Sequence, residues 1–269
     1  MKKYQLTDET IQVDGKTLYR IKALRDFITV SEGEVEAGDL GGYVESEINL
    51  SQYGNCWICG EAKVFGNATV AENAEVSGNV EVFENAKVGG MASVGGKVRV
   101  FGNAEVFEKA LVFGYAEISG NVFVYGEAEI SDYAQIFGNA SVYGKANVSD
   151  NAKIYGNAKV HGNVEVWCDA EVFGETDIFG NECVCEHEKI CGNDKICGLV
   201  KMGKNVKCYV CNDKGYILQL KKMENGKIGR CFYKCDCASG KDVYNLINIR
   251  HILSDAEISE IEKNNRFQM

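Results

Sequence analysis

The stretch Ala62-Lys63-Val64-Phe65-Gly66-Asn67 is one copy of the unit A-x-[V/I]-x-G-N, which decides the fold. Its Val or Ile position recurs every six residues without a break from Ile58 to Ile196. A period of six fits neither an α-helix, at about 3.6 residues per turn, nor a flat sheet with ordinary hairpins. It fits a solenoid in which each unit makes one short strand and one corner, so that three units close a triangular coil of 18 residues.

The positions within the unit predict which side chains are buried. If the repeated Val or Ile is position i, residues i and i−2 point inward, because alternate residues of a strand share a face. Position i−2 is mostly Ala, and Val takes it at Val80, Val98, Val122 and Val164. The corner positions i+2 and i+3 hold mainly Gly-Asn, Glu-Asn or Asp-Asn. We expect a left-handed backbone at the corner, which Gly and Asn tolerate.

Composition and charge restrict the class of protein. Of the 269 residues, 30 are Gly and none is Pro. The net charge of −10 is uneven, since residues 60–198 carry 10 basic and 21 acidic side chains and residues 199–269 carry 13 and 8. The sequence shows neither an apolar signal region at its start nor a run of about 18 apolar residues, so we expect a soluble cytoplasmic protein without a membrane segment. Its 12 Cys would then be mostly reduced, and the scattered basic charge gives no reason to expect nucleic acid.

The repeat resembles that of the hexapeptide-repeat superfamily of left-handed β-helices, which includes many acyltransferases. Its G-N-A-x-V form, headed by Gly38-Asp39-Leu40-Gly41-Gly42-Tyr43-Val44-Glu45-Ser46-Glu47, is closer still to phage and prophage β-helix proteins and to YdcK-like transferases. The resemblance covers about half of the chain and implies a left-handed coil, which the period alone does not establish. It implies an activity much less strongly, because one fold hosts many functions.

Three segments are expected. Residues 1–57 read as a β-rich N-terminal cap and first coil, with strands at 10–13 and 17–21 around the Asp14-Gly15 turn. Residues 58–198 form the hexapeptide-repeat β-helix, and residues 199–269 a small α+β domain with strands at 206–210, 216–223 and 228–235. A helix opened by the capping box Ser254-Asp255-Ala256-Glu257 follows. The Gly38-to-Gly42 stretch lacks the Lys of a phosphate-binding loop and is expected to be a turn into the first coil. The predicted fold class is therefore an all-β, left-handed parallel β-helix with these two ends.

Outward residues 18 apart stack on one face, and two faces carry rows of aromatic rings. Face one carries Phe65, Phe83, Phe101, Phe137, Tyr155 and Phe173, with Ser119 as a gap, beside i−1 residues whose charges alternate in sign. Face two carries Phe107, Tyr125, Tyr143 and Phe179, with His161 among them. Stacked rings can simply stabilise a solenoid. Alternatively, so long an aromatic patch is an interface, and the chain forms a homo-oligomer, a dimer or a trimer, or docks a partner.

Catalytic candidates are few. The resemblance to hexapeptide acyltransferases implies a general-base His near a loop that leaves the coil, and a cleft between subunits for acyl-CoA. The repeat from 58 to 198 has no insertion, and only His161, His187 and His251 are present. His161 reads as a member of the aromatic row, His187 as a corner residue and His251 as part of the C-terminal segment. His161 and His187 remain weak catalytic candidates.

The last coil and its cysteines depart from the pattern. Thr176, Glu182, Glu188 and Asp194 occupy inward positions, which indicates either a coil that opens towards a cap or a site. Cys185, Cys191 and Cys197 fall on three different faces and cannot share one metal ion with Cys183. A weak zinc candidate remains in the C-terminal segment, formed by Cys208, Cys211, Cys231, Cys235 and Cys237. No other cofactor is expected.

These observations favour a non-catalytic binding or scaffold protein of phage or prophage type. We expect it to self-associate through its aromatic rows and to bind or sequester a host protein or a small nucleotide signal. The alternative is a hexapeptide-type acyltransferase that holds acyl-CoA at a subunit interface.

Overall fold

The structure is a computed structural model that describes residues 2–31, 33–185, 189–192, 195–196, 216–222 and 228–234. The chain divides into two compact units, Met1–Lys201 and Met202–Met269. In the second unit the described residues form an antiparallel hairpin of β30 (Tyr216–Lys222) and β31 (Ile228–Lys234), in agreement with two of the predicted strands. The third predicted strand, at 206–210, and the helix after Ser254 lie outside the described residues.

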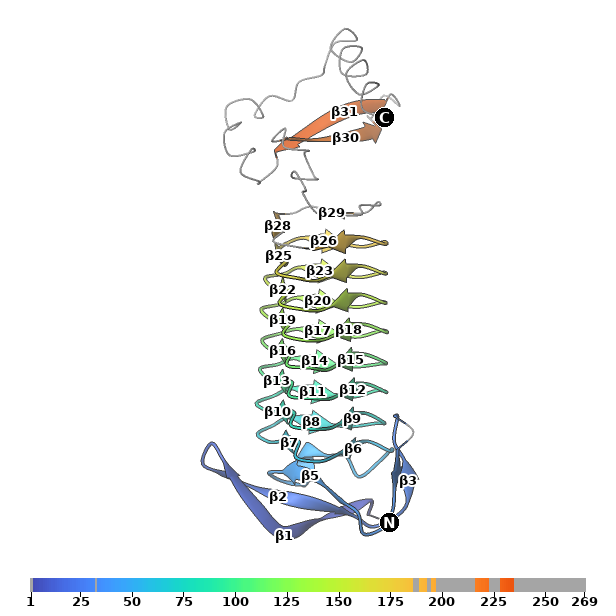
Figure 1. Cartoon of the computed structure of the whole chain (residues 1–269), viewed down its shortest axis with the longest axis vertical. Helices are drawn as coiled ribbons and strands as arrows, with labels where there is room; N and C mark the ends of the chain where they lie inside the picture. Colours follow the sequence, from blue (N-terminus) through green and yellow to red (C-terminus); the bar gives the residue numbers. More distant parts are fainter. Residues whose placement is uncertain are drawn as a thin grey trace. The chain divides into compact units, whose positions relative to one another are not determined.

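The first unit is a three-sided parallel β-helix in which short strands stack in three sheets (Figure 1). Face one contains β1 (Tyr4–Val13), β2 (Lys16–Ala23), β5 (Leu40–Val44), β7 (Lys63–Val64), β10 (Glu81–Val82), β13 (Arg99–Val100), β16 (Glu117–Ile118), β19 (Gln135–Ile136), β22 (Lys153–Ile154), β25 (Glu171–Gly174) and β28 (Lys189–Gly192). Face two contains β8 (Thr69–Val70), β11 (Lys87–Val88), β14 (Glu105–Val106), β17 (Phe123–Val124), β20 (Ser141–Val142), β23 (Lys159–Val160), β26 (Asp177–Ile178) and β29 (Lys195–Ile196). Face three contains β6 (Trp57–Ile58), β9 (Glu75–Val76), β12 (Ser93–Val94), β15 (Leu111–Val112), β18 (Glu129–Ile130), β21 (Asn147–Val148), β24 (Glu165–Val166) and β27 (Cys183–Val184).

The register of these sheets confirms the 18-residue coil. Val82 lies opposite Val64 in the coil before it and opposite Val100 in the coil after it, in parallel pairing. The predicted fold class, a left-handed parallel β-helix, is confirmed.

The core is a stack of like layers. Every Val or Ile at position i from Ile58 to Ile178 is at most 1% exposed, and the Ala or Val residues at i−2 are equally buried as far as Ala170. Full burial of such a side chain contributes about 1.5–3 kcal/mol. The predicted Val/Ile and Ala layers are therefore confirmed from Ile58 to Ala170.

Corners differ from the expectation in one respect. The left-handed residue is always at i+2, and it is not only Gly: Glu84 and Glu108 adopt φ values of 59° and 60° there, beside glycines such as Gly102 at 73°. These acidic side chains bond to the next coil, since the Glu84 carboxylate accepts a hydrogen bond from the Gly102 N–H at 2.9 Å, and Glu108 likewise from Gly126. The bond offsets part of the steric cost of a side chain in this conformation.

The Asn residues at i+3 do not supply the left-handed backbone; on the corner after face one they form a ladder of side-chain amides. The Nδ2 of each Asn donates to the Oδ1 of the Asn one coil further, over 2.8–3.0 Å, and the last donates to a glutamate at 2.6 Å. The members are Asn67, Asn85, Asn103, Asn121, Asn139, Asn157 and Glu175. Each amide has one partner below and one above, so identical residues reinforce one another.

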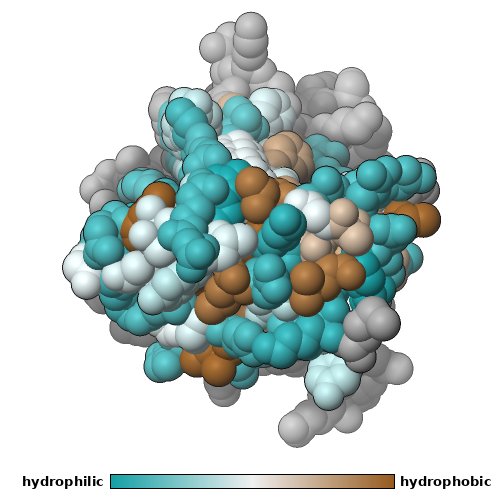
Figure 2. Space-filling model, turned by 90° about the horizontal axis from the view of Figure 1, so that it is seen from below, coloured by the Kyte–Doolittle hydropathy of each residue, from teal (hydrophilic) through white to brown (hydrophobic). Residues whose placement is uncertain are grey.

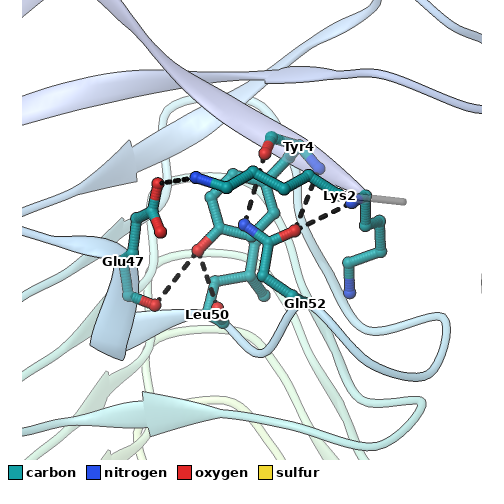
Figure 3. Close-up of polar contacts among 6 residues, drawn as sticks. Lys2, Tyr4, Glu47, Leu50 and Gln52 are labelled. Carbon is teal, nitrogen blue, oxygen red and sulfur yellow. Dashed lines mark hydrogen bonds and ion pairs between the residues drawn. The ribbon is translucent and has the colours of Figure 1, made fainter.

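The N-terminal segment closes the lower end of the solenoid and is fixed to the turn that enters it. The Tyr4 hydroxyl donates to the Leu50 carbonyl at 2.7 Å, and the Gln52 Oε1 accepts the Lys3 N–H at 2.8 Å (Figure 3). Lys2 pairs with Glu47 at 2.8 Å, at the start of the 3₁₀ turn η1 (Glu47–Asn49). A small hairpin, β3 (Phe27–Ile28) and β4 (Glu34–Val35), completes this cap.

A fully buried lysine lies beneath this cap. The Lys3 Nζ donates to the Cys56 carbonyl at 2.7 Å and lies 3.0 Å from the Cys56 Sγ. Burial lowers the pKa of Lys3 and raises the pKa of Cys56. The contact joins the first strand to the first coil, and nothing in the repeat pattern predicted it.

The predicted N-terminal hairpin is present as β1 and β2, joined by the left-handed pair Asp14 and Gly15. The Gly41-Gly42 pair is part of strand β5 and not of a turn. β5 pairs antiparallel with β2 and parallel with β7. A Cβ on Gly41 would lie 2.6 Å from the Ile58 carbonyl oxygen, so glycine permits this close approach.

We predict that Asn103→Ala lowers the free energy of unfolding by about 1 kcal/mol, because it removes two amide–amide hydrogen bonds from the middle of the ladder. Chemical denaturation followed by circular dichroism measures the change. Asn147→Ala, on an outward strand position outside the ladder, is the matched control and should change stability by less than about 0.5 kcal/mol. Equal losses in the two variants would show that the ladder contributes no stability of its own.

Candidate functional site

The aromatic row on face one is stacked ring on ring. Phe65 and Phe83 lie 5.2 Å apart between ring centroids, Phe83 and Phe101 4.9 Å apart, and all three are parallel to within 6°. Beyond the gap at Ser119, Phe137, Tyr155 and Phe173 stack at 4.8 Å. The spacing is close to that of the coils, so Phe83 and Tyr155 have both ring faces covered by neighbouring rings, and Phe101 and Phe137, which flank the gap, have one face covered.

The N-terminal hairpin covers the lower end of this row. Leu18, from β2, and Tyr43, from β5, form a buried cluster with Phe65, which is only 4% exposed, and Phe83 packs partly against it. Of the ten rings predicted as an interface, Phe137 alone reaches 36% exposure. The intramolecular role of the row is therefore directly visible in the structure. Its role as an interface stays a prediction.

The alternating charges beside the row form ion pairs, as predicted. Lys63 pairs with Glu81 at 3.0 Å, and Arg99 lies between Glu81 and Glu117 at 3.8 and 3.7 Å. The Arg99 guanidinium also lies over the rings of Phe83 and Phe101, at 5.2 and 5.1 Å from their centroids. Each such exposed pair contributes at most about 1 kcal/mol to the free energy of unfolding. Together they place paired positive and negative side chains beside the first rings of face one.

Face two places His161 inside its aromatic row. The imidazole stacks on Tyr143 at 4.4 Å and on Phe179 at 5.3 Å, and Tyr143 stacks on Tyr125 at 4.8 Å. The His161 Nε2 is 3.0 Å from the Asp177 Oδ1. Burial raises the pKa of Tyr143, with a smaller contribution from Tyr125 and Asp177. The sequence predicted the row position of His161 but not its carboxylate partner.

This geometry limits what His161 can do chemically. Both ring faces are covered and Nε2 is engaged by Asp177, so Nδ1 is the nitrogen left for a substrate. A His–carboxylate pair is the arrangement that orients a general base. However, each strand from β6 to β26 is followed by the same tight corner, and within residues 58–185 no loop leaves the coil to form a cleft over the imidazole. His187 and His251 lie outside the described residues.

The last coils are partly described. Thr176 is fully buried at its inward position and donates its hydroxyl to the Phe173 carbonyl at 2.7 Å, and Glu182 is 3% exposed. Glu188 and Asp194 lie outside the described residues. Buried polar groups at these positions agree with the expected departure from the core pattern, and Thr176 shows that a hydroxyl can be satisfied there by the backbone.

The structure tests the metal hypothesis only in part. Cys183 and Cys185 lie on one face, and Cys183 accepts a hydrogen bond from the Trp167 Nε1 at 3.0 Å. Among the described residues there is no group of three or more His, Cys, Asp or Glu side chains that could hold a metal ion. The zinc candidates of the C-terminal segment stay predictions, because Cys208, Cys211, Cys235 and Cys237 lie outside the described residues, as does the side chain of Cys231.

Apart from Phe137, the exposed large apolar side chains of the described residues lie away from the predicted rows. On the cap they are separated by polar residues, as the view of its underside shows (Figure 2). They are Leu24, Ile28, Leu40, Ile48 and Tyr53. On the coils Leu111, Phe113, Tyr115 and Tyr133 are between 39 and 57% exposed. The signal for the last two was present in the sequence, since tyrosine replaces the usual Asn at i+3 of a corner. In the part of the chain that is described, no helix is long and apolar enough to cross a membrane.

We predict that His161→Phe keeps the stability of the protein, whereas His161→Ala lowers its free energy of unfolding by about 1 kcal/mol. The reason is that Phe preserves the stack with Tyr143 and Phe179, while Ala leaves a gap in it. Thermal and denaturant unfolding of both variants would measure this. Equal losses in the two variants would show that the bond to Asp177, which both remove, and not the stacking, holds His161 in place.

Comparison with known proteins adds one match. No family model matches the chain. Over 79 residues it is 38% identical to the "Uncharacterized acetyltransferase YdcK" of Escherichia coli strain K12. The matched stretch is 27% of this chain and 24% of YdcK, so the chain spans about a quarter of the length of that relative. The match and the coil geometry agree in making the repeat region a hexapeptide-repeat β-helix similar to that of YdcK-like proteins.

Proposed function

We propose that this protein is a non-catalytic binding or scaffold protein built on a rigid, acidic β-helix. The observation that carries the proposal is the regularity of the coils. From β6 to β26 each six-residue unit repeats the same strand and corner, and residues 58–185 contain no loop that leaves the coil to enclose a substrate. Such a surface is suited to extended contacts with another macromolecule or with a second copy of itself.

Self-association through the aromatic rows is part of this proposal. The outer edges of Phe101 and Phe137 lie on either side of the gap at Ser119, and Phe137 is 36% exposed. Edges of aromatic rings are good contact surfaces because they bury large apolar area with little loss of side-chain freedom. A dimer or a trimer would cover them.

The proposed partner is a host protein or a small nucleotide signal, which the protein would bind or sequester in the cytoplasm. The resemblance of the G-N-A-x-V repeat to phage and prophage β-helix proteins supports this role. The charge of the repeat region, with 10 basic against 21 acidic side chains in residues 60–198, favours a partner with a basic surface.

A hexapeptide-type acyltransferase is the second candidate, and two observations favour it. One is the similarity to YdcK, whose name assigns it to the acetyltransferases. The other is the contact between His161 and Asp177 at 3.0 Å, which would orient the imidazole as a general base. The cleft for acyl-CoA would then lie between subunits, because face two is a flat row of stacked rings in the single chain.

We predict that the combined variant Phe101→Glu with Phe137→Glu contains fewer subunits than the wild-type protein in native mass spectrometry. Two carboxylates in the row would have to be desolvated in the interface. Gln135→Glu, also on the exposed part of face one, is the control for added charge. Unchanged assembly of the double variant would contradict the role of the row as an interface.

We predict that isothermal titration of the wild-type protein with acetyl-CoA shows no binding heat, because the described coils offer no enclosing cleft. Native mass spectrometry of the same sample would show any adduct. Binding that is lost in His161→Ala but kept in His161→Phe would point to the stacked ring as a platform. Binding together with acyl transfer that both variants lose would overturn the scaffold proposal in favour of the enzyme.

A further inference from the structure

Exposed apolar residues gather at one edge of the coils. Of the eight large apolar side chains that are exposed on the described coils, four lie in two consecutive coils, on face three and at the corner where it turns towards face one. They are Leu111, Phe113, Tyr115 and Tyr133, which are 39, 45, 51 and 57% exposed. We call this set the tyrosine edge. Unlike the rings of face one, these side chains leave much of their surface in water.

The geometry of the tyrosine edge is that of a ridge. Tyr115 and Tyr133 stack at 4.9 Å at the corner position that holds the Asn ladder after face one. Phe113 lies beside them on face three, and the residues above and below it in its own row are Ser131 and Gly95, so no ring covers either of its faces. Exposed rings of this kind, gathered in one place, are more typical of a contact surface than of a free one.

The charges along this corner change sign across the ridge. Lys97 lies one coil before Tyr115, with its Nζ 5.3 Å from the centroid of the Tyr115 ring. Asp132 immediately precedes Tyr133, and Asp150 lies one coil after Asp132, where one of its carboxylate oxygens accepts the Cys168 N–H at 2.9 Å. Asp132 and Asp150 are both exposed. The edge therefore runs from a cation through two stacked tyrosines to two carboxylates.

The edge is therefore complementary in charge to the same edge of a second copy that runs in the opposite direction. A two-fold axis that passes between Tyr115 and Tyr133, perpendicular to the long axis of the coils, exchanges the coil of Lys97 with the coil of Asp150. It also brings Tyr115 against the partner's Tyr133. In a parallel arrangement, by contrast, Lys97 would face the same lysine and Asp150 the same aspartate. The charges thus select one orientation of a second copy.

We propose that a second copy of this chain docks antiparallel on the tyrosine edge, with Lys97 of each copy paired to the partner's Asp150. The proposal rests on the self-association proposed above and adds a contact surface distinct from the rows on faces one and two. Phe113 packs beside the partner's Tyr133, and the two Tyr pairs form the centre of the contact. The area is small compared with that of a permanent dimer, which buries about 1,200–2,000 Å² or more. The dimer is accordingly reversible and depends on concentration.

Charge reversal tests the orientation directly. Lys97→Glu alone places Glu opposite Asp150 twice per dimer, and Asp150→Lys alone places Lys opposite Lys97 twice. We expect each variant to raise the dissociation constant of the dimer about tenfold or more in analytical ultracentrifugation, because like charges then face each other. An equimolar mixture restores both pairs, so we expect a heterodimer of the two variants with an affinity near that of the wild-type protein.

Lys145→Glu is the control for charge reversal, since Lys145 occupies the same corner position on a different edge and is also exposed, with Glu127 at 3.4 Å as its own ion-pair partner. It should leave the dissociation constant unchanged. Asp150 has a left-handed backbone (φ of 57°), so unfolding of Asp150→Lys is measured as well; Glu84 and Cys168 show that this corner position accepts other side chains. The two variants are mixed only if circular dichroism and unfolding show that both are folded to the same extent.

The outcomes separate the two proposals. Failure of the mixed variants to pair better than either variant alone overturns the antiparallel contact. If the wild-type protein still assembles in that case, and Phe101→Glu with Phe137→Glu reduces its subunit number, self-association stands and only the tyrosine edge is rejected. A wild-type protein that remains a monomer over its whole soluble concentration range overturns both.

Discussion

The hydrogen bonds between successive coils are the constraint on which the rest of this structure depends. The amide of Glu81 donates to the carbonyl of Val98 at 3.0 Å, that of Arg99 to Ala116 at 3.0 Å, and the same bond recurs at every step. These bonds hold residues 18 apart in register at a spacing close to the contact distance of stacked π-systems. Identical side chains that are 18 residues apart must therefore stack on one another in successive coils. Aromatic rings, amides and opposite charges gain from this arrangement, and the sequence uses all three.

Much of the fold could be predicted because this constraint leaves its period in the sequence. The burial of Val106 or Ala104 follows from the six-residue repeat alone. The corners were predicted less well, because Gly and Asn share a tolerance for positive φ and the sequence does not say which of two adjacent residues adopts it. In the structure the residue at i+2 has the positive φ, even where that residue is Glu84. The Asn side chain at i+3 is then available for the hydrogen-bonded ladder.

The candidate sites were predictable to a smaller extent, since they depend on distances that the period does not contain. The sequence places His161 in an aromatic row, but its partner Asp177 comes from the next coil and from the other outward position of the strand. How far a row of rings is exposed to solvent also cannot be predicted from the period. Phe65 is buried because the N-terminal hairpin brings Leu18 over it, and the hairpin lies outside the repeat.

In a solenoid, translation from coil to coil makes one position on a face equivalent to the next, so a local site requires a break in the repeat. The described coils contain few such breaks. Ser119 interrupts the row on face one, and in the same coil Phe113 and Tyr115 extend outward from the adjoining corner. A ring lost from an internal stack and rings gained on an edge thus occur within one coil. The stability of the single chain would favour Asn at the corner, as in the ladder after face one, and Phe in place of Ser119 in the row on face one. Departures that lower the stability of the single chain at one level of the solenoid favour a contact outside it. For this reason we propose that the tyrosine edge fixes the position of a second copy along the coils, which the regular rows on faces one and two leave open.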